Sequence, residues 1–242
     1  MKITNKTILI TGANRGIGRS LVEEVLKRGA KRVYAGTRQP WTHPDGRVTR
    51  LAMDVTNGMQ IRDAVAQVEF LDILINNAGA YSLHGDYFSD RSLLERHIAT
   101  NLFGPYDVTQ AFLPLLIRSR GAIVNVLSLA SLAGLPLTPA YAISKAAAFS
   151  LTQSLRALLA GQGVRVHAVF PGPVDTDMTR GLEMPKASAE SVAQTIVEGI
   201  ENGEEDILPD PTSASLAESW RSGEAKALER QFATYIVAST TS

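Results

Sequence analysis

The feature that most constrains the fold is an alternation of short, continuously apolar runs with longer segments of helical periodicity. The apolar runs predict strands at residues 8–10, 33–35, 48–53, 71–75, 122–126, 164–170 and 207–208. The periodic segments predict helices at residues 18–28, 59–68, 92–118, 140–160 and 189–200. Strands without polar alternation are buried on both faces, which is typical of a parallel sheet covered by helices. Because crossovers between parallel strands are right-handed, we expect an α/β fold, a doubly wound, Rossmann-like three-layer sandwich.

Length and composition limit the number of domains and the classes of partner. The chain has 242 residues without a linker or repeat, which predicts a single domain. Its 24 basic residues balance its 24 acidic ones, so we expect no nucleic acid or membrane partner. The lack of cysteine excludes disulfides and is compatible with a cytoplasmic protein, and the spacing of the 4 histidines predicts no metal site.

A glycine-rich segment, TGANRGIG, follows the first expected strand and precedes the first expected helix. It contains Gly12, Gly16 and Gly18. Glycines let the backbone turn sharply and approach a ligand, and a helix that follows them directs free N–H groups and a positive dipole toward it. The segment therefore predicts a pyrophosphate site. Its GxxxGxG spacing differs from the GxGxxG of the common dinucleotide motif, and a plain tight turn is the alternative.

A set of motifs in a fixed order resembles the short-chain dehydrogenase/reductase family, in its compact single-domain branch. The resemblance covers residues 6 to about 210. Its motifs are TGANRGIG, Asp54, Asn76-Asn77-Ala78-Gly79, Asn101, Ser128, Tyr141-Ala142-Ile143-Ser144-Lys145 and Pro171-Gly172. The ordered set is more specific than any one motif. The resemblance implies an oxidoreductase that transfers a hydride between a nicotinamide cofactor and a carbonyl or secondary alcohol.

The end of the second expected strand indicates which dinucleotide is bound. In such folds an acidic residue there binds the ribose of NAD, whereas an arginine accommodates the 2′-phosphate of NADP. Here the strand ends without an acid at Thr37-Arg38, and the Arg38 guanidinium offers donors suited to phosphate. Arg15 can flank the same phosphate. We therefore expect NADP(H); the alternative is that both arginines are ordinary surface residues.

The resemblance implies a cofactor site that combines the glycine segment with several strand ends. Asp54 is implied to approach the adenine, or else to accept hydrogen bonds in a turn. Asn77 either contacts the cofactor or braces neighbouring strands, while Val174 and Thr176 are implied to face the nicotinamide carboxamide. The full expected set is Gly12, Asn14, Arg15, Gly16, Ile17, Gly18, Arg38, Asp54, Val55, Asn77, Ala78, Gly79, Tyr141, Lys145, Pro171, Gly172, Val174 and Thr176.

Tyr141 and Lys145 are candidates for the proton-transfer chemistry. They are four residues apart in an expected helix and so share one face. A free tyrosine has a pKa of about 10, and a nearby ammonium is expected to lower the pKa of Tyr141 toward the range of an efficient general acid. Ser128 follows the strand at 122–126, where its hydroxyl can donate to a substrate carbonyl oxygen. Ser131 is an alternative, but the family motif aligns with Ser128.

Asn101 is expected to act through its backbone. Pro105, four residues later, cannot donate to the Asn101 carbonyl, and Gly104 eases a local distortion of the helix. The freed carbonyl could hold a water linked to Lys145, which is similar to the proton relay of the family; a simple kink is the alternative. The expected catalytic set is Asn101, Ser128, Tyr141 and Lys145, with no metal.

The substrate region is expected to be apolar. The resemblance implies an adaptable lid near residues 173–190, and residues 211–242 form a tail without a recognisable motif. The lid carries Met178, Leu182 and Met184, and the pocket candidates are Tyr81, Leu83, Leu129, Leu135 and Leu137. His84 and His97 are expected on loop and helix surfaces. Because the helix at 140–160 is apolar or small around much of its circumference, we expect a homodimer or homotetramer.

Two other classes of protein compete with this interpretation. The first is a non-catalytic NADP(H)-binding regulatory protein, since fold alone does not imply activity. The intact set of Asn101, Ser128, Tyr141 and Lys145 argues against it. The second is a sugar epimerase or dehydratase of the larger branch of the family, which the glycine spacing and the short carboxyl-terminal region disfavour.

Overall fold

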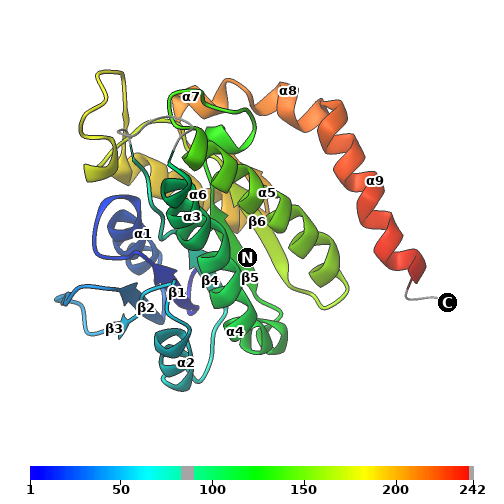
Figure 1. The fold of residues 1–242 in the computed structure, drawn as a ribbon. Helices are drawn as coiled ribbons and strands as arrows, with labels where there is room; N and C mark the ends of the chain where they lie inside the picture. Colours follow the sequence, from blue (N-terminus) through cyan, green and yellow to red (C-terminus); the bar gives the residue numbers. More distant parts are fainter. Residues whose placement is uncertain (83–89, 240–242) are drawn as a thin grey trace.

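Seven parallel strands form one sheet in the order β3-β2-β1-β4-β5-β6-β9 (Figure 1). The computed structural model describes residues 1–82 and 90–239, so Leu83 and His84 lie outside the described residues. The strands are β1 (Thr7–Thr11), β2 (Arg32–Thr37), β3 (Val48–Ala52), β4 (Ile73–Asn76), β5 (Ala122–Val126), β6 (Arg165–Val169) and β9 (Asp206–Ile207). This order confirms the expected doubly wound parallel sheet.

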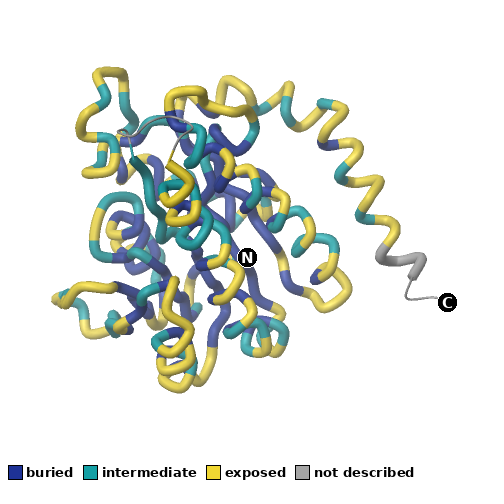
Figure 2. Tube along the Cα trace, viewed as in Figure 1, coloured by how far each residue is buried: buried dark blue, intermediate teal, exposed yellow. Residues whose placement is uncertain are grey.

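Helices cover both faces of the sheet and complete a three-layer sandwich. One face carries α1 (Gly16–Lys27) and α6 (Ala189–Asn202), and the other carries α2 (Gly58–Ala66), α4 (Gly104–Ser119) and α5 (Pro139–Ala160). The strands are buried along most of their length, whereas the outer faces of the helices are exposed (Figure 2). The continuous apolar runs of the sequence therefore form strands that are covered by helices on both faces.

The order of the strands reverses between β1 and β4. Connections from β1 run to β2 and then β3 on one side, while β4, β5 and β6 follow on the other. The carboxyl ends of β1 and β4 thus diverge into a crevice, which is where ligands bind in open α/β sheets. The glycine segment follows β1 and the segment Asn77–Ala80 follows β4, so the sheet brings these two expected cofactor segments together.

The helix expected at residues 92–118 is interrupted. The structure has α3 (Arg91–Ile98), a π-helical turn at Ala99–Phe103 and then α4. Pro105 lies in the first turn of α4, where its missing N–H does not break the hydrogen-bond ladder. Gly104 adjoins Val55, and a Cβ at Gly104 would lie 2.8 Å from Val55 Cγ2. The expected distortion near Asn101 is therefore present as a widened turn.

The stretch expected to form a lid has structure of its own. Strands β7 (Val174–Asp175) and β8 (Ala187–Ser188) pair in parallel and flank a short 3-10 turn, Asp177–Thr179. Lys186 Nζ donates to the Thr179 carbonyl oxygen at 2.7 Å. Residues 174 to 188 are thus a small closed unit that packs onto α6 through buried Val174.

The tail without a recognisable motif folds into three helices, α7 (Pro211–Ala214), α8 (Ala217–Ser222) and α9 (Glu224–Ser239). In Figure 1, α9 runs along the side of the molecule past α5. Lys226, at its start, is 2% exposed and forms ion pairs with Asp206 at 2.8 Å and Glu229 at 3.0 Å. Arg156 of α5 pairs with the same two carboxylates. This buried ionic cluster joins the tail to the sheet edge and to α5.

Helix α5 keeps part of its apolar surface exposed. Ile143 is 44% and Leu158 is 51% exposed, while Ala148 and Phe149 of the same helix are buried. The second subunit expected against this helix stays a prediction. Within residues 1–82 and 90–239, no helix combines the length and the apolar character needed to cross a bilayer.

Buried His167 on β6 predicts a loss of stability in acid. Burial lowers the pKa of His167 to about 4, and Arg165 and Arg156 act in the same direction. The unfolded chain takes up this proton at a pH of about 6.5, so the free energy of unfolding should fall by about 3 kcal/mol as the pH drops from about 6.5 to about 4. Thermal unfolding across this range should show a smaller fall for His167→Gln than for the wild type. Equal slopes for the two proteins would contradict the prediction.

Candidate active site

The glycine segment forms a narrow cradle at the carboxyl end of β1. Gly12 and Gly16 have φ of +66° and +50°, a region in which side chains are strained. At Gly18, an added Cβ would lie 2.2 Å from the Gly12 carbonyl oxygen and 2.5 Å from Asn77 Nδ2. Glycine is therefore required at these positions by the backbone itself.

Asn77 braces this cradle. Its Nδ2 donates to the carbonyl oxygens of Thr11 and Gly12 at 2.9 and 3.2 Å. Thr11 Oγ1 in turn accepts hydrogen bonds from the backbone N–H groups of Asn77 and Ala78, at 3.0 and 2.9 Å. Two roles were expected for Asn77, a cofactor contact or the bracing of neighbouring strands. These hydrogen bonds show the bracing role. Thr11 was not singled out from the sequence, because its role depends on a neighbouring strand.

The start of α1 is suited to a phosphate. Arg15 occupies its N-cap position without a capping hydrogen bond from its side chain, so no side chain competes at the helix N-terminus. Asn14 and Ile17 are half-buried, and Ile17 packs against the core. The cradle accepts only glycine at these positions and lies in front of a helix N-terminus without a side-chain cap. This arrangement can accommodate the pyrophosphate of a dinucleotide.

Arg38 and Asp54 lie together at the ends of β2 and β3. Arg38 is 68% exposed and its Nη1 is 4.0 Å from Asp54 Oδ2. Asp54 also accepts hydrogen bonds from the backbone and hydroxyl of Thr56, at 2.9 and 2.7 Å, as a turn residue does. Arg50, which sequence reasoning missed, donates to Thr37 Oγ1 at 3.0 Å and to the Gln39 carbonyl oxygen at 3.2 Å. It thereby holds the segment that carries Arg38.

Ser128 and Tyr141 meet beyond the carboxyl end of β5. The Ser128 hydroxyl lies close enough to the Tyr141 side chain to lower its pKa, and it also caps the 3-10 turn Leu129–Ser131 by accepting from Ala130 N–H at 3.1 Å. Ser131 is buried, and its hydroxyl accepts from Ser128 N–H at 3.2 Å. The structure thus places Ser128 beside Tyr141, whereas the Ser131 hydroxyl takes part in capping the 3-10 turn.

Lys145 lies one helical turn beyond Tyr141 and is 6% exposed. Its Nζ donates to the Val126 carbonyl oxygen at 2.8 Å and lies 5.9 Å from the centre of the Tyr141 ring. A Cβ added to Gly79 would come within 3.7 Å of Lys145 Nζ, so the segment after β4 passes close to this ammonium. The structure therefore brings Gly79 and Lys145 together, as expected for neighbouring parts of one site.

Asn101 joins this group through its side chain. Its Oδ1 accepts from Ala80 N–H at 2.8 Å, and its Nδ2 donates to the Ala80 carbonyl and to Ser144 Oγ, both at 2.9 Å. The Ser144 hydroxyl donates to the Tyr141 carbonyl oxygen at 2.7 Å. Asn101 thus links the segment after β4 to α5. This side-chain role differs from the backbone role expected for Asn101 from the position of Pro105.

The pKa values differ from the expectation that Lys145 acidifies Tyr141. Burial raises the pKa of Tyr141 to about 12, and the nearby Ser128 hydroxyl only partly opposes this rise. Burial also lowers the pKa of Lys145 to about 8. The expected lowering of the Tyr141 pKa by Lys145 is therefore not seen in this structure: the loss of solvent around the phenol is the largest effect, and the Lys145 ammonium is hydrogen-bonded to a backbone carbonyl.

Two aromatic side chains flank Tyr141. The rings of Tyr81 and Tyr141 meet edge to face with centres 4.9 Å apart, and His97 lies at 6.3 Å in a similar orientation. His97 was expected on a helix surface, but it is 2% exposed, and its Nδ1 is hydrogen-bonded to the Leu93 carbonyl at 2.8 Å. That prediction was wrong because α3 packs against α5, which buries one side of a short polar helix.

The segment after β6 closes the other side of the crevice. Pro171 and Gly172 follow β6 after one intervening residue, Phe170, and the Pro171 carbonyl accepts from Leu129 N–H at 3.1 Å. Thr176 reaches the glycine cradle, since a Cβ at Gly16 would lie 3.1 Å from Thr176 Cγ2. The Val174 side chain, expected to face the nicotinamide, is 3% exposed and belongs to the core under α6.

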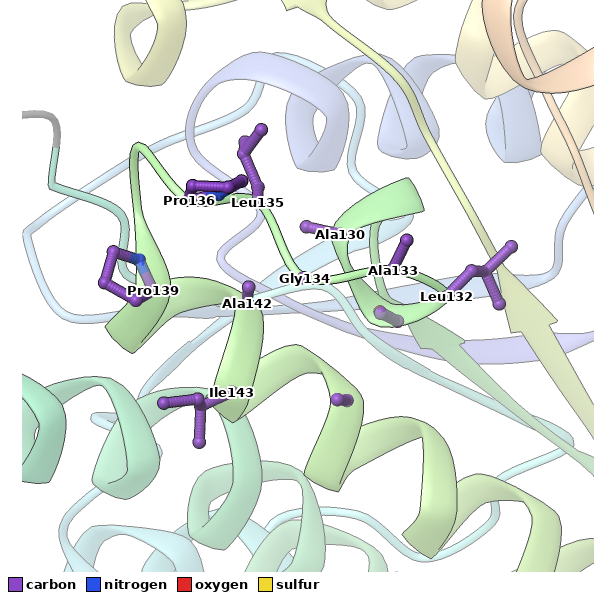
Figure 3. A pocket seen from close by; sticks show the side chains of 11 residues that line it. Ala130, Leu132, Ala133, Gly134, Leu135, Pro136, Pro139, Ala142 and Ile143 are labelled. Carbon is purple, nitrogen blue, oxygen red and sulfur yellow. The ribbon is translucent and has the colours of Figure 1, made fainter.

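An apolar cavity of about 400 Å³ adjoins the loop that carries Ser128 (Figure 3). Its lining comprises residues 130–136 with Pro139, Ala142, Ile143 and Ala146. Of the expected pocket residues that the structure describes, only Leu135 belongs to it. Leu137, Met178 and Met184 are exposed rather than gathered into this cavity. Within the described ranges, no group of three or more histidine and acidic side chains is arranged to hold a metal ion.

A glycine cradle at the switch point of a doubly wound sheet defines the class of a dinucleotide-binding protein. The sequence profile of the short chain dehydrogenases matches residues 6–187. The chain therefore belongs to the short-chain dehydrogenase/reductase family.

Relatives support this assignment over different parts of their length. The chain is 35% identical to estradiol 17-beta-dehydrogenase 2 of Mus musculus over 74% of its own length, but spans only 51% of that relative. It is 32% identical to the ketoacyl reductase HetN of Nostoc sp., with 88% of this chain and 82% of the relative covered. The crystal structure of a short chain dehydrogenase from Burkholderia cenocepacia in complex with NADP is similar, with 33% identity and a TM-score of 0.87 over 96% of this chain and 98% of the other.

Proposed function

We propose that the protein is an NADPH-dependent oxidoreductase that transfers a hydride between the nicotinamide and a carbonyl or secondary alcohol. The observation that carries this proposal is the proximity of the Ser128 and Tyr141 side chains, with Lys145 one helical turn away and its Nζ 5.9 Å from the centre of the Tyr141 ring. These side chains lie beyond β5, next to the strand end that supports the glycine cradle. The NADP complex of the Burkholderia relative supports the choice of cofactor.

Arg38 supports NADP(H) over NAD(H). It follows β2 without an acidic neighbour in the strand, is exposed, and has only a distant pairing with Asp54. Its guanidinium is therefore available to a 2′-phosphate, which prefers planar, charged donors. Arg15 at the start of α1 is exposed as well and can add a second positive charge.

The side chains then divide the work of the reaction. Bound NADPH supplies the hydride to the carbonyl carbon. Ser128 Oγ and the Tyr141 hydroxyl donate hydrogen bonds to the substrate oxygen as negative charge develops on it. Because its pKa is about 12, Tyr141 holds its proton at neutral pH until the more basic alkoxide forms, and then donates it. Lys145 would hold the ribose of the nicotinamide half and, through a water on the Asn101 carbonyl, would take part in returning a proton to Tyr141.

An apolar substrate is proposed from the surroundings of this group. Leu135 and Leu137 lie on the loop between Ser128 and Tyr141, while Met178 and Met184 lie on the closed unit after β6. All four side chains are more than a third exposed, and flexible methionines adapt to substrates of different shape.

A panel of ketones, aldehydes, quinones and 3-oxoacyl thioesters, with NADPH oxidation followed by absorbance, tests the proposal. We expect saturable oxidation of NADPH with at least one apolar carbonyl compound and a secondary alcohol as the product. Tight binding of NADPH without turnover of any compound would instead favour a non-catalytic binding protein. Failure to bind NADPH at all would remove the basis of the proposal.

A further inference from the structure

Asp210, just beyond β9, is a buried carboxylate that contacts the segment expected to bind the nicotinamide. It is 4% exposed, and its Oδ2 accepts a hydrogen bond from Gly172 N–H at 2.7 Å. The contact joins residues far apart in the sequence and belongs to no motif of the chain. A charged acceptor makes this one of the stronger hydrogen bonds to the backbone after β6.

The surroundings hold Asp210 in one orientation. Its Oδ1 accepts from Ser213 N–H at 3.0 Å, and its Oδ2 accepts from the Ser213 hydroxyl at 2.8 Å. Ser213 is fully buried. On the other side, a Cβ at Gly172 would lie 2.8 Å from Asp210 Oδ1, so the backbone approaches the carboxylate too closely for any other residue. The carboxylate and the glycine therefore fit one another closely.

The same segment is tied to the catalytic loop on its opposite side. The Pro171 carbonyl accepts from Leu129 N–H, the residue after Ser128. Two hydrogen bonds thus lead from Asp210 through Gly172 and Pro171 to the loop of Ser128. A displacement of Gly172 would change the position of this segment relative to both the cofactor cleft and Ser128.

The tail fixes the position of Asp210. Trp220 of α8 packs on Phe170 and Phe149, with ring centres 5.9 and 5.7 Å apart, and its Nε1 donates to Asp206 Oδ2 at 2.8 Å. Phe170 directly precedes Pro171. The residues on both sides of Asp210 are therefore anchored, on one side by β9 and on the other by α8.

We propose that Asp210 is a positioning residue that holds the Pro171-Gly172 segment against the nicotinamide half of the cofactor. This inference rests on the proposed function and assigns a role to the start of the tail. Its consequence is specific: Asp210 should affect the affinity for the nicotinamide half and not the affinity for the adenosine half, which binds at the opposite side of the switch point.

The test compares NADPH with adenosine 2′,5′-bisphosphate, a fragment that lacks the nicotinamide. Isothermal titration of Asp210→Ala should show a Kd for NADPH raised about tenfold, the loss expected for a hydrogen bond to a charged group, with the Kd for the fragment changed by less than about twofold. Ser215→Ala is the matched control: it removes an exposed hydroxyl nearby that donates to the Thr212 carbonyl oxygen and has no hydrogen bond with Asp210. Its two Kd values should stay in the wild-type ratio.

Asp210→Asn and Gly172→Ala extend the test if Asp210→Ala does not fold. Asn keeps one carbonyl oxygen for two backbone N–H groups, so it should raise the Kd for NADPH less than Ala does. Gly172→Ala disturbs the same hydrogen bond from the side of the loop, so it should raise the Kd for NADPH as well. An unchanged ratio of the two Kd values in these variants would overturn the inference, while NADPH binding and turnover by the wild type would leave the proposed function intact. A wild type that binds no NADPH would instead defeat the proposed function.

Discussion

Replacing Tyr141 with phenylalanine is expected to lower kcat about 1000-fold while the Kd for NADPH stays close to that of the wild type. The substitution removes the proton donor and one of two hydrogen-bond donors to the substrate oxygen, and it leaves the ring that packs against Tyr81 and His97. Because the pKa of Tyr141 is about 12, the wild-type phenol carries its proton at neutral pH, and the variant has no such proton to give. Steady-state kinetics and NADPH titration of the same preparation measure both effects.

Tyr106→Phe provides the matched control for this experiment. Tyr106 lies on α4 and is 45% exposed, so the loss of its hydroxyl should leave kcat unchanged. A Tyr141→Phe enzyme that keeps the wild-type kcat would exclude Tyr141 as the proton donor. A loss of NADPH binding in that variant would show that the phenol acts in cofactor binding rather than in the chemical step.

The second large effect is expected for Arg38→Asp. The change removes the donors proposed for the 2′-phosphate and places a carboxylate beside Asp54, which lies 4.0 Å from the guanidinium in the wild type. Loss of a charged hydrogen bond together with repulsion of the phosphate should lower kcat/KM for NADPH roughly 100-fold. The value for NADH should fall far less, since NADH carries no phosphate at this position.

Arg230→Asp controls for the change in net charge. Arg230 is exposed on α9, and the same substitution there should leave both kcat/KM values unaltered. The ratio of kcat/KM for NADPH to that for NADH is the deciding quantity. If Arg38→Asp leaves this ratio as it is in the wild type, the assignment of Arg38 to the phosphate is wrong.

The layers of the fold could be predicted from the sequence because most strands of the large sheet are apolar runs and most of them are separated by helices. The exceptions have physical causes. The π-helical turn at Ala99–Phe103 is followed by Gly104, which lies close to Val55 of a distant segment, and β7 pairs with β8 so that Val174 is opposite Ala187. Near the start of helix α9, Lys226 belongs to an ionic cluster with Arg156 of α5 and Asp206 of β9, so the place of this helix depends on distant residues.

The residues of the candidate site could be predicted where a sequence motif contains them. Their burial and pKa values could not be predicted, because these depend on packing. Ser128, Tyr141 and Lys145 came from spacing and resemblance, and the structure brings them together. The pKa of Tyr141 could not be predicted, because it depends on how deeply α5 and its neighbours bury the phenol. His97 and Asp210 likewise become part of the surroundings of the site only through contacts between elements distant in the sequence.

The position of Trp220 gives the molecule a built-in optical reporter. The chain has 2 tryptophans, and they sit in separate regions: Trp41 lies in the segment after β2, and Trp220 stacks on the residue that directly precedes Pro171. Indole emission is sensitive to the polarity and contacts of the ring. Single-tryptophan versions of the protein would therefore let changes near Pro171 and changes in the segment after β2 be followed separately, in real time and without an added dye.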